Sequence, residues 1–182
     1  MARVPYLDSA DLAPENRDLL SRNINLYRAL VHSPEGMRSF LELARYIRFR
    51  SKIDPRLREM AILQVGYLTK SEYEYSHHVK IGREFGVSDA DIRAIVADTH
   101  GEQTALPALE RAILKAAREL TAQPSLSDAT YAALAAELGN AQIIDLIMTI
   151  SFYCGVVRML AALQIDVEDD YMHYLEEFPL PK

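Results

Sequence analysis

The sequence predicts an all-α protein that forms one domain over residues 1–182. Alanine, leucine, arginine and glutamate, which favour helices, are frequent, whereas the chain has only 7 glycines and 8 prolines. Prolines and capping residues divide it into segments whose apolar positions follow the helical period. No segment keeps the alternation that is typical of a strand, and 182 residues are enough to bury a sizeable core.

Prolines and capping residues mark the helices of the first half of the chain. Pro14 and Pro34 each suit a first helical turn, where the missing N–H costs nothing. Asp54 is a good N-cap, Ser71 caps the following segment, and Gly86 suits the position after a helix end. The helices expected here cover residues 14–20, 24–31, 34–50, 55–69 and 72–86.

The second half follows the same pattern and ends in an apolar helix and a tail. Ser88 and Ser127 suit N-caps, and Pro107 begins an amphipathic segment. Residues 141–165 are apolar nearly all round, which is typical of a helix buried in the fold or in an oligomer interface. The acidic, aromatic tail is expected to wrap over a neighbour or to be partly ordered. The helices expected here cover residues 92–97, 107–122, 128–139 and 141–165.

Composition excludes several classes of function. With 20 basic and 26 acidic residues, the formal net charge is −6, which argues against a dedicated nucleic-acid binder. The single cysteine, Cys154, excludes an internal disulfide and a Cys-x-x-Cys redox pair. No apolar run approaches about 18 residues, so no membrane span is expected. The first residues do not resemble a signal peptide, so we expect the protein in the cytoplasm.

One polar cluster could carry chemistry. Glu74 and His78 are four residues apart on one expected helix and share a face with Ser71, which lies one turn earlier. A carboxylate beside an imidazole makes an acid/base pair, because the carboxylate orients the ring or raises its pKa. Glu59, on the preceding helix, could project towards the same place in a helical hairpin.

Structural explanations compete with this interpretation. Glu74 fits the third position of a capping box that begins with Ser71, so it could simply finish a helix end. His78 could be an exposed residue paired with Glu74, and Tyr75 a packing residue. His77 points about 100° away and suits a surface or interface. Glu74 and His78 are too few for a metal site, and Cys154, in an apolar run, suits an inert core thiol.

Two segments resemble the carboxymuconolactone decarboxylase family, which shares its all-helical fold with alkylhydroperoxidase D. The matching motifs are Arg-Glu-x-x-Ile-Leu at residues 58–63 and Tyr-Glu-x-x-x-His at residues 73–78. The resemblance extends over about residues 30–165. It implies an alkylhydroperoxidase D-like helical bundle with an N-terminal extension, residues 1–33, and a C-terminal tail, residues 166–182.

The resemblance also implies a site. The alkylhydroperoxidase branch carries Cys-x-x-Cys-x-x-x-His, and its two thiol positions fall on Ser71 and Glu74, so this chain is a thiol-free variant. His78 is then the acid/base or electrostatic residue, oriented by Glu74, with Glu59 completing a proton relay. Three further residues are expected to bind substrate: Ser71, Tyr75 and Arg58. The arginines considered as anchors for substrate carboxylates are Arg58, Arg83 and Arg158.

Three functions follow. The first is a cofactor-free, metal-free lyase that acts by acid/base chemistry on a small carboxylated or lactone-like metabolite. The second, an alkylhydroperoxidase-like antioxidant, is disfavoured because peroxide reduction needs a thiolate and a resolving thiol. The third is a non-enzymatic helical oligomer that binds a ligand or partner. The family resemblance implies a homo-oligomer, a trimer or hexamer.

Overall fold

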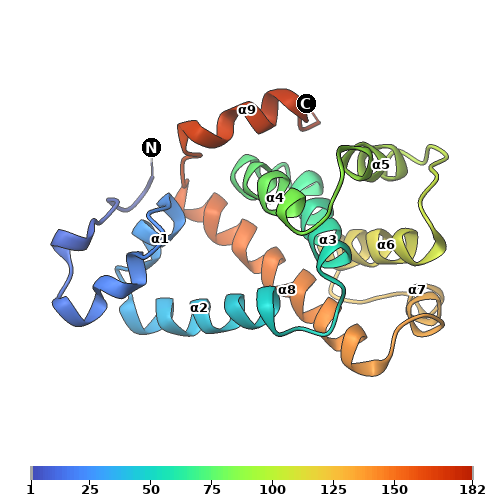
Figure 1. Ribbon diagram of the computed structural model, residues 1–182, viewed down its shortest axis with the longest axis horizontal. Coiled ribbons are helices and arrows are strands. Elements are labelled where there is room, and N and C mark those ends of the chain that lie inside the picture. The colour runs from blue at the N-terminus through green and yellow to red at the C-terminus, as the bar shows by residue number, and fades with distance from the viewer. Residues whose placement is uncertain (1, 182) are drawn as a thin grey trace.

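The computed structural model describes residues 2–181, and every regular element in that range is helical, as predicted (Figure 1). Two short 3-10 helices open the chain, and the tail ends in a helix. The elements are η1 Ser9–Asp11, η2 Pro14–Leu20, α1 Asn25–Leu30, α2 Pro34–Phe49, α3 Pro55–Leu68, α4 Glu72–Glu84, α5 Asp89–Thr99, α6 Ala108–Ala122, α7 Asp128–Ala135, α8 Asn140–Leu163 and α9 Asp169–Glu177.

Helix α3 is the centre of the bundle. It packs against α4, α5, α6 and α8, and all its residues from Leu57 to Tyr67 are buried. A helix surrounded on every side needs no polar face, which explains the apolar sequence from Met60 to Leu63. The charged pair Arg58 and Glu59 is nevertheless buried on this helix. A buried charge needs a partner, so the packing around α3 must supply one.

A tight turn folds α4 back along α3. Lys70, in the left-handed backbone region with φ 51°, reverses the chain, and Ser71 caps α4. Gly66 lets the helices approach, because a Cβ there would lie only 3.2 Å from the Tyr75 Cα. The hairpin anticipated from the sequence therefore forms.

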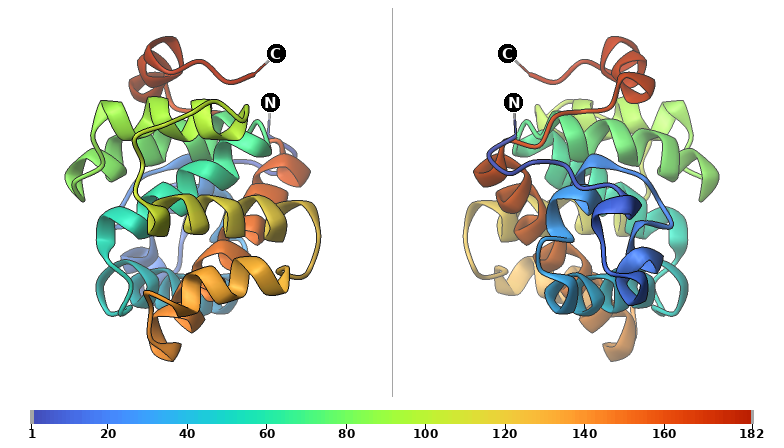
Figure 2. Two further views of the ribbon diagram at one scale, coloured as in Figure 1. Left: turned by 90° about the vertical axis from the view of Figure 1, so that its right-hand side faces the viewer. Right: turned by 90° about the vertical axis from the view of Figure 1, so that its left-hand side faces the viewer.

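The tail differs from the sequence prediction because it contains a well-formed helix. Helix α9 packs on α4, and Phe178 after it is buried beneath the guanidinium groups of Arg83 and Arg93. The N-terminal segment runs beside the end of α8, where the Arg3 N–H donates to the Leu163 carbonyl (Figure 2). Two helix bounds also differ from the prediction. Helix α5 covers Asp89–Thr99 and not only residues 92–97, and α7 ends at Ala135 and not at residue 139.

Helix α8 is long and apolar enough to cross a membrane by length and composition, with a mean hydropathy of 1.9 over its most apolar window. In this structure 44% of that window is buried, against α3, α6 and α7 among others. The core helix of a globular protein passes the same test, so α8 is weak evidence for a membrane span. The absence of a span remains a prediction.

The close approach at Gly66 gives a stability test. We expect Gly66→Ala to lower the free energy of unfolding by about 1–3 kcal/mol, because the added methyl meets the Tyr75 backbone. Gly155→Ala in α8 is the matched control, since its Cβ would meet no atom within 4 Å. Helix propensity should make that control neutral or slightly stabilising. Urea unfolding measures both, and equal effects would contradict the packing argument.

Candidate active site

A cavity of about 220 Å³ lies between the N-terminal segment and α2 on one side and α4 and α8 on the other. Helix α4 contributes Glu74, His77 and His78 to its wall, and α8 contributes Phe152 and Tyr153. The remaining lining residues are Ser21, Arg22, Ile24, Leu26, Tyr27, Phe40, Leu41, Ala44, Arg45, Arg48, Phe49, Tyr73, Ile81 and Val156.

His78 lies between two carboxylates at the inner end of this cavity. Its Nδ1 is 2.6 Å from Glu59 Oε2 on α3, and its Nε2 is 2.9 Å from Glu74 Oε1 on its own helix. The contact between His78 Nε2 and Glu74 Oε1 is an ion pair by distance, but its angles are not those of a hydrogen bond. All three side chains are at most 5% exposed. The structure thus brings together the three residues expected to be catalytic.

Arg58 completes the charge balance behind His78. Its Nε donates to Glu59 Oε1 at 3.0 Å, and its Nη2 lies 2.9 Å from the same oxygen. Both residues are buried, which rules out the solvated face that their neighbouring charges could have formed. Two buried cations and two buried carboxylates therefore form one neutral group, which avoids the large penalty of an unpaired buried charge.

These contacts set the proton on His78. Burial disfavours the cation, but the carboxylates of Glu74 and Glu59 outweigh it and raise the pKa of His78 to about 9. Burial would likewise raise the pKa of Glu59, yet His78 and Arg58 hold that pKa below its usual value. At neutral pH the pair is an imidazolium beside a carboxylate, so His78 can donate a proton or stabilise negative charge.

The capping box considered for Glu74 does not form. Ser71 Oγ accepts a hydrogen bond from the Glu74 backbone N–H, as an N-cap should. The Glu74 carboxylate, however, turns away from the helix end towards His78. Its position in the structure is therefore explained by the histidine and not by the cap.

The three residues expected to bind substrate do not line the cavity. Ser71 only caps α4, Tyr75 is fully buried against Tyr67, and Arg58 lies behind Glu59 under the Phe85 ring. The other arginines considered as anchors are also displaced. Arg83 forms ion pairs with Asp89 and Glu177, and Arg158 donates a hydrogen bond to the Cys154 carbonyl on α8.

Sequence reasoning missed the arginines and the tyrosine that do line the cavity. Arg45 and Arg48 lie on α2, and Arg22 precedes α1. Tyr153 packs edge-on against His78, with ring centroids 4.9 Å apart. No motif marks these residues, because they come from segments that only the packing of α1, α2 and α8 brings together.

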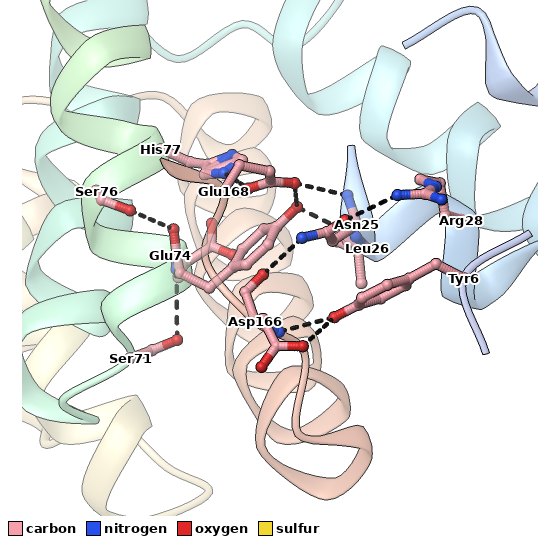
Figure 3. A network of polar contacts seen from close by, with 11 residues as sticks. Tyr6, Asn25, Leu26, Arg28, Ser71, Glu74, Ser76, His77, Asp166 and Glu168 are labelled. Carbon is pink, nitrogen blue, oxygen red and sulfur yellow. Dashed lines mark hydrogen bonds and ion pairs between the residues drawn. The ribbon is translucent and has the colours of Figure 1, made fainter. Parts of the chain in front are cut away.

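His77, expected at a surface or an interface, is instead buried within the chain's own fold, in a clamp that joins both ends of the chain to α4 (Figure 3). Its ring stacks between Tyr73 and Tyr171, with centroids 4.1 and 3.7 Å away, and its Nε2 lies 2.7 Å from Glu168 Oε2. Glu168 Oε1 accepts from the Tyr73 hydroxyl and from the Asn25 backbone N–H. Burial holds the pKa of His77 well below its usual value, so the neutral ring donates to Glu168.

Cys154 lies outside the cavity. Its thiol is buried on α8 near the Thr121 hydroxyl, at 3.7 Å. It is the only cysteine in the chain, and it does not line the cavity that holds His78. Within residues 2–181 no group of three or more histidine, cysteine, aspartate or glutamate residues is arranged to hold a metal ion.

The fold and this site define an all-helical protein with an alkylhydroperoxidase D-like core. Residues 34–119 match the family described as Carboxymuconolactone decarboxylase family. This match and the shared fold confirm the family that the motifs predicted. The comparison with curated proteins finds no match.

Solved structures share the fold at low sequence identity. An uncharacterized peroxidase-related protein from Ralstonia eutropha, described as an alkylhydroperoxidase AhpD core, has a TM-score of 0.80 and 20% identity, covering 96% of this chain and 95% of its own. The debrominase Bmp8, in complex with 2,3,4-tribromopyrrole, has a TM-score of 0.79 and 17% identity, with coverages of 97% and 99%. A peroxidase-related protein from Silicibacter has a TM-score of 0.66 and 18% identity, with coverages of 79% and 76%.

The charge on His78 can be tested by NMR. We expect the imidazole nitrogens to report a doubly protonated ring at pH 7 and to titrate near pH 9. Because the folded pKa exceeds the unfolded value of about 6.5, this contribution to stability is complete below pH 6.5 and is lost as the pH rises through 9. A midpoint near the unfolded value would contradict the two-carboxylate arrangement.

The clamp at Glu168 can be tested by unfolding. We expect Glu168→Gln to lower the free energy of unfolding by about 1–3 kcal/mol, because it weakens hydrogen bonds to the Tyr73 hydroxyl, the Asn25 N–H and His77. Glu176→Gln, at an exposed position on the helix that begins directly after Glu168, is the matched control and should stay within about 0.5 kcal/mol of the parent. If the two variants unfold alike, the clamp does not stabilise the protein.

Proposed function

We propose that the protein is a carboxymuconolactone decarboxylase-like lyase that uses acid/base chemistry, without a cofactor, on a small carboxylated or lactone-like metabolite. The observation that carries the proposal is the buried Glu59–His78–Glu74 arrangement at the end of a cavity of small-molecule size. The family match supports it, and the structural relatives include an enzyme, the debrominase.

In this proposal each residue has a distinct role. Loss of CO₂ from a lactone breaks the bond to the carboxylate carbon and leaves its electron pair in a conjugated dienolate, which must then take up a proton at carbon. The imidazolium of His78 stabilises the dienolate and supplies that proton. Glu74, which lines the cavity, receives or relays protons, and Glu59 fixes the ring from behind. The family resemblance implied the reverse, with Glu74 orienting His78 and Glu59 completing the proton relay.

The alternatives draw less support from the site. An antioxidant role needs a thiol at the cavity, and Cys154 lies elsewhere with no second cysteine in the chain. A non-enzymatic oligomer would need the charged group only for stability. Yet a buried ionic group is weak evidence for stability, and this one borders a cavity. Self-association as a trimer or hexamer and location in the cytoplasm remain predictions.

Turnover of 4-carboxymuconolactone, followed as CO₂ release, tests the proposal. We expect His78→Gln to reduce kcat by about 10²-fold or more, since it removes the proton donor and the cation. His173→Gln, at an exposed histidine on α9, is the matched control and should keep full activity. Circular dichroism should show unchanged helix content in both variants.

Two results would overturn the proposal. Full activity in His78→Gln would exclude the assigned site. No turnover by the parent protein, of this lactone or of a panel of small carboxylated lactones, would exclude the decarboxylase function and favour the binding protein.

A further inference from the structure

The arginines around the cavity differ from most others in the chain. Elsewhere most arginine side chains pair with carboxylates, as expected in a protein with 26 acidic residues. Within residues 2–181, Arg22, Arg45 and Arg48 take part in no ion pair or side-chain hydrogen bond, although all three line the same cavity. The arginines that do pair include Arg28, Arg38, Arg50, Arg56, Arg83 and Arg118.

The charges of Arg22 and Arg48 act on the ionisable side chains of the cavity wall. Burial is the main cause of the low pKa of His77, and the positive charges of His78, Arg22 and Arg48 add to it. Arg48 also acts on Tyr153, where it opposes the effects of burial and of the glutamates that raise the pKa of the hydroxyl. Arg22 and Arg48 are half-buried, whereas Arg45 is exposed and extends its influence towards Asp18. Arg22 and Arg48 are therefore the two arginines of the cavity wall whose charges act on other residues of that wall.

The cavity wall combines charged and apolar side chains. The Glu59, Glu74, His78 and Arg58 group at the inner end is neutral overall, so it does not compensate the arginines. Glu74 and His78 are the members of this group that line the cavity, and Glu74 Oε1 lies 2.9 Å from His78 Nε2. The rest of the wall is largely apolar and includes the rings of Phe40 and Phe152, which pack against each other with centroids 5.1 Å apart.

We propose that Arg22 and Arg48 form an anion subsite that orients a small, flat carboxylate in the cavity. The carboxylate lies on the arginines, the apolar body packs against the exposed sides of the phenylalanine rings, and an uncharged hydrogen-bond donor or acidic C–H faces Glu74. Guanidinium groups suit this task because they bind carboxylates with paired hydrogen bonds. Binding of the carboxylate does not depend on the proposed function; only the reaction of the bound molecule does.

Arg22 gives the subsite a component outside the family match, which begins at residue 34. The segment that carries Arg22 is fixed just beyond it, where the Asn25 N–H donates to Glu168 and the Leu26 N–H donates to the Tyr73 hydroxyl (Figure 3). Glu168 belongs to the tail. The two ends of the chain, both outside the predicted core of residues 30–165, therefore position a specificity residue for the site within it.

Binding of benzoate and of its uncharged analogue benzamide, followed by NMR titration at pH 7, tests the subsite. We expect benzoate to bind at least tenfold more tightly than benzamide and to shift the signals of Phe152 and Tyr153. Arg48→Gln should weaken benzoate about tenfold, as loss of a charge-assisted hydrogen bond does, and leave benzamide unchanged. Arg22→Gln should act in the same direction, and added salt should weaken benzoate only.

Arg50→Gln is the matched control. It makes the same change of charge on the same segment of chain, but Arg50 pairs with Glu42 and does not line the cavity. It should not alter benzoate binding. Because Arg48 has no ion pair to lose, Arg48→Gln should unfold at the same temperature as the parent, so a loss of binding would not reflect a loss of folding.

Three results would overturn the subsite: no saturable benzoate binding, equal affinity for benzoate and benzamide, or benzoate binding unaffected by both Arg48→Gln and Arg22→Gln. These outcomes are separable from the decarboxylase assay. If benzoate binding depends on Arg48 but no lactone is turned over, the subsite stands and the proposed reaction fails. If lactone turnover needs His78 but neither arginine affects benzoate binding, the reaction stands and the subsite fails.

Discussion

The contact between His78 on α4 and Glu59 on α3, at 2.6 Å, is the interaction on which the site depends. Each group would be unstable alone in the protein interior, because a buried charge without a partner is costly. Arg58 and Glu74 complete the compensation, so four charges are buried together. The close approach of the two helices at Gly66 makes this contact geometrically accessible.

The helices around this charged group cover it on one side and leave it open to the cavity on the other. The remainder of α3 is covered by α5, α6 and α8 and is mostly apolar from Met60 onwards, with Gln64 the buried polar exception, so the ionic group occupies one edge of a largely hydrophobic core. Its open side meets the cavity, where Glu74 and His78 form part of the wall. A charged group buried only for stability would need no such opening, and the low dielectric of the site strengthens its action on a bound molecule.

The ends of the chain close the other wall. Glu168 accepts hydrogen bonds from α4 and from the N-terminal segment at once, and the stack of Tyr73, His77 and Tyr171 places aromatic surface over the joint. The result is a cavity with a neutral ionic group inside and uncompensated arginines around it. Because the arginines carry a net charge and the ionic group does not, a bound anion has a preferred orientation in this cavity. A uniformly apolar or uniformly charged pocket would not impose one.

The sequence by itself determined the helices and the pairing of Glu74 with His78, because both depend on local spacing, caps and the 3.6-residue period. The motif around Arg58 and Glu59 also indicated the family. Tertiary structure alone decided that Glu59 reaches His78, that Ser71 and Tyr75 lie off the cavity, and that Arg22 and Arg48 line it. Such positions depend on how helices distant in sequence pack, and periodicity within one helix carries no information about its partners.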